Sequence, residues 1–285
     1  MYSSKPSKFF NEIKLTPIVE NSTIFCAGYE LGIWRHKQYA EHLMEWLTDY
    51  ALIEDELKSF NSSTGRNLTK QAANRVYKAT DKKPVNKRGE IGEISLHAVC
   101  RYFFDTIPFV TTCYFKSATN DTVKGFDLIH TRLLPDNKFE IWFGESKFYT
   151  ERNKAIESAI ISINKVFEDN YFQNEKIWIL SKQKNQSGTS VHVERLFESN
   201  VTIDELLKVA VFVIGIVAES EATKNANDLN DEYFVSLTEE INIMAKKLFS
   251  NKIKQKVNLK LIYIPLGNKK ELICSFDAKL NGIQK

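Results

Sequence analysis

Apolar residues recur at helical spacing in several separate stretches of the chain. In residues 89–104 they fall on one face, which is the arrangement of an amphipathic helix packed against a core. The residues of that face are Ile91, Ile94, Ala98, Val99 and Tyr102. The same spacing predicts helices over residues 36–60, 68–80, 151–170 and 232–249, and a closing helix or turn over residues 270–280.

Predicted strands alternate with these helices. The longest apolar run, Val209–Ala218, is typical of a strand that is buried on both faces. Other apolar or β-rich runs predict strands at residues 22–29, 108–116, 123–129, 139–147, 176–180 and 259–266. From residue 89 the order is helix, three strands, helix, strand. This order predicts an α/β fold with a mixed β-sheet flanked by helices, and the later strands would extend the same sheet.

A predicted hairpin in the middle of the chain places two acids opposite each other. Its turn is Pro135-Asp136-Asn137. If the turn centres on Asp136, antiparallel partners have residue numbers that add up to 272, so Asp127 is paired with Glu145. Side chains paired in this way have Cβ atoms about 5 Å apart. Lys147 lies two residues beyond Glu145 and therefore points to the same face.

The face that carries these charges is otherwise apolar. Phe139, Ile141 and Phe143 precede Glu145 and Lys147 at alternate positions of the second strand. Charged side chains on a core-facing surface are costly unless they are paired or bind a metal ion. Two interpretations follow, namely a partly buried ion pair at the sheet edge or a catalytic metal site.

The catalytic interpretation is a nuclease of the PD-(D/E)xK type, whose working parts are two acids and a lysine at this spacing. Asp127 and Glu145 would hold Mg²⁺ through oxygen atoms, and the backbone carbonyl of Ser146 could add a ligand. Mn²⁺ is expected to substitute for Mg²⁺. The metal ion would polarise the phosphate and make a bound water more acidic. Lys147 would orient that water or stabilise charge in the transition state. The same superfamily core has the element order given above.

Acids also begin the helix that precedes the hairpin. In many relatives in this superfamily a glutamate on the first helix adds a metal ligand, and Glu93 matches that pattern best. Glu90 lies one turn earlier on the same face and is kept as an alternative. Acids in a first helical turn also favour the helix dipole, which is the structural explanation. His97 lies on the same flank, and we predict that it packs under the sheet.

Composition limits the classes of function. The chain has 285 residues, a net charge of +3 and four scattered cysteines, with no Cys-x-x-Cys pair. These features predict no zinc site and no disulfide framework, and they favour a reducing cytoplasm. No apolar run is long enough for a membrane span, and the N-terminus does not resemble a signal peptide. A Gly-rich phosphate loop with a Walker lysine is absent, which argues against ATP hydrolysis.

Four short motifs together resemble the HamA family, the nuclease subunits of the Hachiman anti-phage system. The motifs are Gly89-Glu90-Ile91-Gly92-Glu93, Gly125-Phe126-Asp127, Gly144-Glu145-Ser146-Lys147 and Phe276-Asp277. The resemblance covers residues 85–280 and implies a metal-dependent deoxyribonuclease with a PD-(D/E)xK restriction-endonuclease-like core. It also implies a DNA helicase partner, HamB, which restrains the nuclease until aberrant or invading DNA is sensed.

The resemblance leads to a division of the chain into two parts. Residues 1–85 are predicted to form an N-terminal accessory or interaction region, and residues 86–285 a nuclease domain with further α/β elements. The apolar stripe of the first helix could dock the helicase or could pack on the chain's own core. Its residues are Tyr39, Leu43, Trp46 and Leu47. Two other functions stay open, a standalone restriction or repair endonuclease and a non-catalytic interaction subunit.

Overall fold

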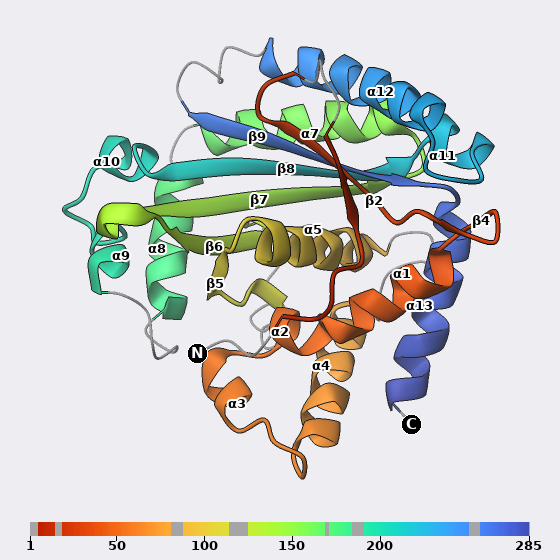
Figure 1. Cartoon of the computed structure of the whole chain (residues 1–285). Coiled ribbons are helices and arrows are strands. Elements are labelled where there is room, and N and C mark those ends of the chain that lie inside the picture. Colours follow the sequence, from red (N-terminus) through yellow and green to blue (C-terminus); the bar gives the residue numbers. More distant parts are fainter. Residues whose placement is uncertain are drawn as a thin grey trace.

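Seven strands form one mixed sheet, seen in a computed structural model that describes residues 5–14, 19–80, 88–113, 125–168, 171–183, 191–250 and 257–284 (Figure 1). In spatial order the strands are β1 (Asn11–Ile13), β2 (Ser22–Cys26), β9 (Asn258–Leu266), β8 (Ala210–Glu219), β7 (Phe139–Tyr149), β6 (Leu128–Leu133) and β5 (Ile107–Val110). The four central strands β2, β9, β8 and β7 run parallel, and the outer pairs are antiparallel. A small hairpin, β3 (Tyr29–Glu30) and β4 (Ile33–Trp34), lies outside this sheet.

Helices cover both faces of the sheet. Figure 1 shows α7 (Arg152–Val166) and α12 (Asp231–Phe249) on one side, and α5 (Gly89–Phe103), α1 (His36–Glu45) and α13 (Lys269–Gln284) on the other. The remaining helices are α2 (Leu47–Ala51), α3 (Glu54–Lys58), α4 (Gly65–Thr80), α8 (Tyr171–Gln183), α9 (Val191–Arg195), α10 (Ile203–Leu207) and α11 (Glu221–Asn225). The prediction of an α/β fold with a mixed sheet between helices is confirmed.

The two faces bury separate apolar cores because strand residues alternate between them. On β7, Trp142 belongs to the core on the α5 side, whereas Ile141 and Phe143 belong to the core on the α7 side. On β8, Val213 and Phe212 divide in the same way. A strand that is apolar on both faces has to lie inside the sheet, which explains why β8 is central.

The predicted core order is confirmed for α5, then β5, β6 and β7, then α7. The strand that follows is β8, and helices α8, α9 and α10 lie between it and α7 in the sequence. The strand predicted at residues 176–180 is wrong, because this segment is part of helix α8. Buried Phe172, Lys176 and Ile179 recur at helical spacing, while Ile177 is exposed. A run of four apolar residues such as Ile177–Leu180 does not distinguish a strand from a buried helix.

The single helix predicted over residues 36–60 is also wrong, because this segment forms α1, α2 and α3. The chain is extended at Leu52 and Ile53, where the backbone N–H of Ile53 is bonded to the side chain of Glu56. The apolar stripe on α1 and α2 is fully buried against the chain's own helices, so it is not a free docking face.

The first 85 residues contribute directly to the sheet. Strand β2 pairs with β9, and helix α1 packs on α13. The boundary after residue 85 stays a prediction. The predicted strand residues 114–116 and 123–124 lie outside the described residues.

Two other expectations concern the cellular compartment, namely cysteines without disulfides and a chain without a membrane span. The cysteines Cys26, Cys100, Cys113 and Cys274 are all free thiols. Within the described ranges, the helices lack the combination of length and apolar character that crossing a bilayer requires.

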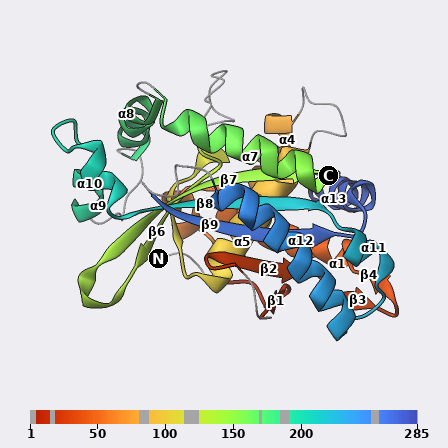
Figure 2. The ribbon, with the colours of Figure 1, turned by 90° about the horizontal axis from the view of Figure 1, so that it is seen from above.

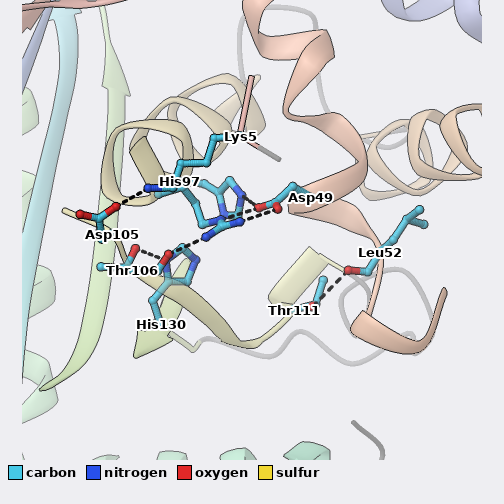
Figure 3. A network of polar contacts seen from close by, with 9 residues as sticks. Lys5, Asp49, Leu52, His97, Asp105, Thr106, Thr111 and His130 are labelled. Carbon is cyan, nitrogen blue, oxygen red and sulfur yellow. Dashed lines mark hydrogen bonds and ion pairs between the residues drawn. The ribbon is translucent and has the colours of Figure 1, made fainter. Parts of the chain in front are cut away.

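A buried charge network fixes α2 against α5 (Figure 3). Asp49 accepts hydrogen bonds from His97 Nε2 at 2.7 Å and from Arg101 Nε and Nη2 at 2.9 Å. Arg101 also donates to the carbonyl of Thr106, whose hydroxyl bonds to His130 on β6. Burial alone would raise the pKa of Asp49, but the bonds from His97 and Arg101 lower it to about 2. The prediction that His97 packs in the core is confirmed.

This network predicts a large stability loss for Asp49→Ala. The substitution leaves the buried Arg101 guanidinium without its carboxylate, and breaking such a pair costs about 3–5 kcal/mol. Asp55→Ala is the matched control, because Asp55 pairs with Lys58 on the surface and should contribute less than about 1 kcal/mol. Urea unfolding of both variants measures the difference. Equal stabilities would show that the network does not anchor α2.

Candidate functional site

The β6–β7 hairpin has the predicted register. Leu128 pairs with Gly144, and Leu133 pairs with Phe139 next to the turn. The turn at Pro135–Asn137 places Asp136 and Asn137 in the left-handed region, with φ of 62° and 56°, which these residue types tolerate better than most. In Figure 2 the hairpin extends beyond the neighbouring strands. The candidate site lies at the opposite end of the hairpin, inside the molecule.

Asp127 lies immediately before β6 and is fixed to β7 by two hydrogen bonds. Its backbone N–H donates to the carbonyl of Gly144 at 2.9 Å. Its Oδ2 atom accepts from the backbone N–H of Ser146, also at 2.9 Å. The carboxylate is therefore held beside the backbone of Glu145, across the hairpin.

Glu145 and Lys147 are in contact on the α7 side of the sheet. Lys147 Nζ lies 2.6 Å from Glu145 Oε1, and it also donates to Ser162 Oγ of α7 at 2.9 Å. Both charged side chains are largely buried. Sequence reasoning missed Ser162, because nothing in its local sequence marks the contact with a strand fifteen residues earlier.

Helix α5 approaches the hairpin from the other face. A Cβ atom at Gly92 would lie 2.6 Å from Ser146 Oγ, so this close approach requires glycine. Glu93 follows directly, and its Oε2 atom accepts a hydrogen bond from the hydroxyl of Tyr50 at 2.7 Å. Glu90 is buried one turn earlier. Glu93 is thus bonded to Tyr50, a side chain on which the charge of Asp127 also acts.

Asp127 is electrostatically linked to groups on both faces. On the α5 side, the pKa of Tyr50 lies well above its ordinary value. Burial is the largest cause, the charge of Glu93 comes next, and the charge of Asp127 adds to the shift. On the α7 side, burial and then the carboxylates of Glu175, Glu145 and Asp127 raise the pKa of Tyr171 to about 12. Acids from β7, α5 and α8 therefore lie near the end of the hairpin at which Asp127 is located.

Tyr171 and Glu175 belong to α8, of which residues 176–180 were predicted as a strand. Glu175 is 7 % exposed, and a Cβ atom at Gly125 would lie 2.8 Å from its Oε2 atom. Gly125 is part of the Gly125-Phe126-Asp127 motif, so its lack of a side chain makes room for this carboxyl. Burial raises the pKa of Glu175 to about 7.

The acids near the hairpin form no closed metal cage within the described part of the chain. Over the residues that the structure describes, no group of three or more His, Cys, Asp or Glu side chains could hold a metal ion. Mg²⁺ usually takes only one or two protein carboxylates and keeps several waters. Asp127 and Glu145, with the Ser146 carbonyl, are compatible with that requirement, whereas a closed protein cage is not present in this part of the chain.

The buried Glu175 predicts a stability that depends on pH. Its pKa is raised in the folded chain, so the folded state binds more protons than the unfolded state between about pH 4.5 and pH 7. Stability should fall as pH rises through this window, and the penalty persists above it. Glu175→Gln should therefore gain thermal stability relative to the parent at about pH 8 but not at about pH 5. Glu168→Gln, at an exposed position, is the control. A difference that is independent of pH would contradict the shift.

The four motifs that resemble a known family are distributed around this site. Arg88, next to the first motif, forms an ion pair of 3.2 Å with Asp277 of the last motif. The second and third motifs are joined by the bonds of Asp127 described above. Residues nearly two hundred positions apart thus meet at one end of α5.

Comparison with known protein families gives a match to HamA over residues 7–280. No curated protein matches the chain. Because the match spans nearly all of the 285 residues, it also includes most of the N-terminal region that the sequence motifs left unassigned. The chain therefore belongs to the HamA family of the Hachiman anti-phage defence system.

Proposed function

We propose that the protein is a Mg²⁺-dependent DNA nuclease that acts as the effector of a defence complex. The observation that supports this most is the Asp127 carboxylate, which is held by the N–H of Ser146 beside Glu145, whose own carboxylate contacts Lys147. Two carboxylates and a lysine on adjoining strand ends are the groups that hydrolysis of a phosphodiester by a metal-dependent nuclease requires.

In this proposal Asp127 and Glu145 hold the metal ion, together with the carbonyl of Ser146. When bound, Mg²⁺ would polarise the scissile phosphate and acidify a water. Glu93 contributes from the other face of the sheet, where Tyr50 fixes its carboxylate.

Lys147 supplies the positive charge. Its ammonium group is oriented by Glu145 and by Ser162, so its position is set before substrate arrives. A preorganised cation stabilises the negative charge that develops on the phosphate, or it orients the attacking water. Its largely buried environment strengthens such an interaction relative to bulk water.

One observation favours a non-catalytic alternative. Glu145 and Lys147 form an ion pair, as the structural interpretation of the hairpin expects. In an interaction subunit that ion pair would have only a structural role. A standalone endonuclease is the third possibility, and it would need no partner. Cleavage assays and copurification separate the three.

The first test is cleavage of plasmid DNA with Mg²⁺, with Mn²⁺ and with a chelator. Asp127→Asn and Glu145→Gln should each reduce the rate by about a hundredfold or more, because each removes a charged metal ligand. Glu151→Gln is the control, since Glu151 forms an exposed pair with Lys154 near the same strand. Full activity of Glu145→Gln, or cleavage in chelator, would contradict the proposal.

A second test asks whether Glu93 acts in the site. Tyr50→Phe removes the hydroxyl that fixes Glu93, so the variant should need a higher Mg²⁺ concentration and cleave about tenfold more slowly. Tyr39→Phe is the matched control, because the hydroxyl of Tyr39 is equally buried and bonds to Ser95 instead. Each variant should lose about 1 kcal/mol of stability. If both had the Mg²⁺ dependence of the parent, Glu93 would lie outside the site.

The proposed partner is a HamB-like helicase that restrains the nuclease. Since the stripe on α1 and α2 is buried, the N-terminal contact surface should include the turn between β3 and β4. Leu31 in that turn is 97 % exposed and has φ of 51°, and neighbouring Ile33 is 65 % exposed. An exposed leucine in the left-handed region stabilises nothing within its own chain.

The tagged protein should therefore copurify with the product of a neighbouring helicase gene. Leu31→Glu with Ile33→Glu should weaken the complex about tenfold or more, as expected for exposed apolar anchors. Leu133→Glu, on the β6–β7 hairpin and 75 % exposed, is the control. If the Leu31→Glu, Ile33→Glu variant bound the helicase as tightly as the control does, the contact would lie elsewhere on the chain.

A further inference from the structure

A cavity of about 210 Å³ lies next to Glu145, between the hairpin and helices α7 and α8. Its floor is apolar and includes Phe126, Phe143 and Ile214. All three side chains are buried in the core on the α7 side of the sheet. The cavity thus joins an apolar interior directly to the candidate catalytic carboxylate.

The rim of the cavity is polar and partly open. It is formed by Tyr171 of α8 and by Ser162 and Lys165 of α7. Tyr171 is half-buried, so its ring borders the cavity while part of it reaches solvent. Lys165 is exposed at the same rim and carries the positive charge that a phosphate backbone would meet there.

The cavity is larger than a single water needs and smaller than a pocket for a drug-sized ligand. A water occupies about 30 Å³ of liquid, whereas pockets for drug-sized ligands are about 300–1,000 Å³. A volume of about 210 Å³ suits one small ring system. An apolar floor with an aromatic rim is also the environment in which planar rings stack.

We propose that this cavity receives an unpaired nucleobase from the strand that is cleaved, so that the substrate is single-stranded or unwound DNA. The proposal rests on the nuclease function proposed above. Glu145 itself lines the cavity, so a phosphate that lies at Glu145 brings the base of its own nucleotide, or of the next one, to the cavity. A base in an intact duplex is stacked and paired, and it enters such a site only after being extruded.

The wall at Gly125 has a buried acid behind it. Gly125 lines the cavity, and a Cβ atom at this position would lie 2.8 Å from Glu175 Oε2, so the wall stays open only because this residue is glycine. Stacking itself is tolerant of sequence, and the site would therefore accept any base.

The test compares binding of a single-stranded oligothymidylate with an abasic strand of the same length. Both probes have the same phosphates, and only one has bases. Fluorescence polarisation is measured with Mg²⁺ on the full chain carrying Lys147→Ala, which is expected to slow cleavage. The oligothymidylate should bind about fivefold to a hundredfold more tightly, which is the effect expected of one stacked base.

Three variants in that background locate the effect. Tyr171→Ala should bring the two affinities within about twofold of each other, whereas Tyr171→Phe should retain the difference. Val166→Phe should also abolish it by filling the cavity, since Val166 lines it. Phe60→Ala, at an exposed aromatic residue near α3, is the control and should change nothing.

Equal affinity for both probes, or a difference that survives both Tyr171→Ala and Val166→Phe, would overturn the base site. Cleavage by the unmodified protein is measured separately. If DNA is cleaved but the probes bind equally, only the base site fails. If the base preference is present but no metal-dependent cleavage occurs, the nuclease function fails and the base site stands.

Discussion

The hydrogen bond from the Ser146 N–H to the Asp127 carboxylate is the contact on which the site depends. The strand ladder ends at Leu128 and Gly144, so Asp127 is outside regular pairing. This bond fixes the Asp127 carboxylate beside Glu145, where its charge acts on both Tyr50 and Tyr171. One main-chain donor thus sets the position of the Asp127 carboxylate at this end of the sheet.

Two neighbouring residues of α2 couple the site to the N-terminal region. Asp49 and Tyr50 are neighbours on α2, and they bond to opposite parts of α5. Asp49 holds the middle of α5 through His97 and Arg101, while Tyr50 bonds to Glu93 near its beginning. Displacement of α2 would therefore disturb stability and the candidate site together, which offers a physical route by which a partner on the N-terminal region could restrain activity.

Local sequence was sufficient to predict the turn, the register and α5, although β6 covers Leu128–Leu133 and not the predicted residues 123–129. Turn residues at 135–137 and the apolar residues Phe139, Ile141 and Phe143 at alternate positions of β7 favour the pairing that brings Asp127 next to Glu145. The sequence shows glycine at positions 92 and 125 but does not explain why glycine is needed there. The structure gives the reason, which is the close approach of Ser146 in one case and of Glu175 in the other.

Long-range contacts could not be predicted in the same way. The short run at residues 176–180 is apolar in either secondary structure, and only the burial of Phe172 and Glu175 outside it indicates a helix. Tyr50 and Ser162 carry no motif, because each acts through a partner on a different element. The break at Leu52 and Ile53 depends on packing of α2 against α4 and α5 and not on a proline or glycine.

The central claim is that Asp127 and Glu145 form one metal site beside Lys147. Crystals of the full chain grown with Mn²⁺ and a short DNA strand test it directly, because anomalous scattering locates the ion independently of any activity. The account predicts an anomalous peak at ligand distance from the carboxylates of both Asp127 and Glu145, with Lys147 Nζ turned toward the phosphate. An ion bound elsewhere, with Lys147 still paired to Glu145 and the DNA phosphate remote from both, would contradict it.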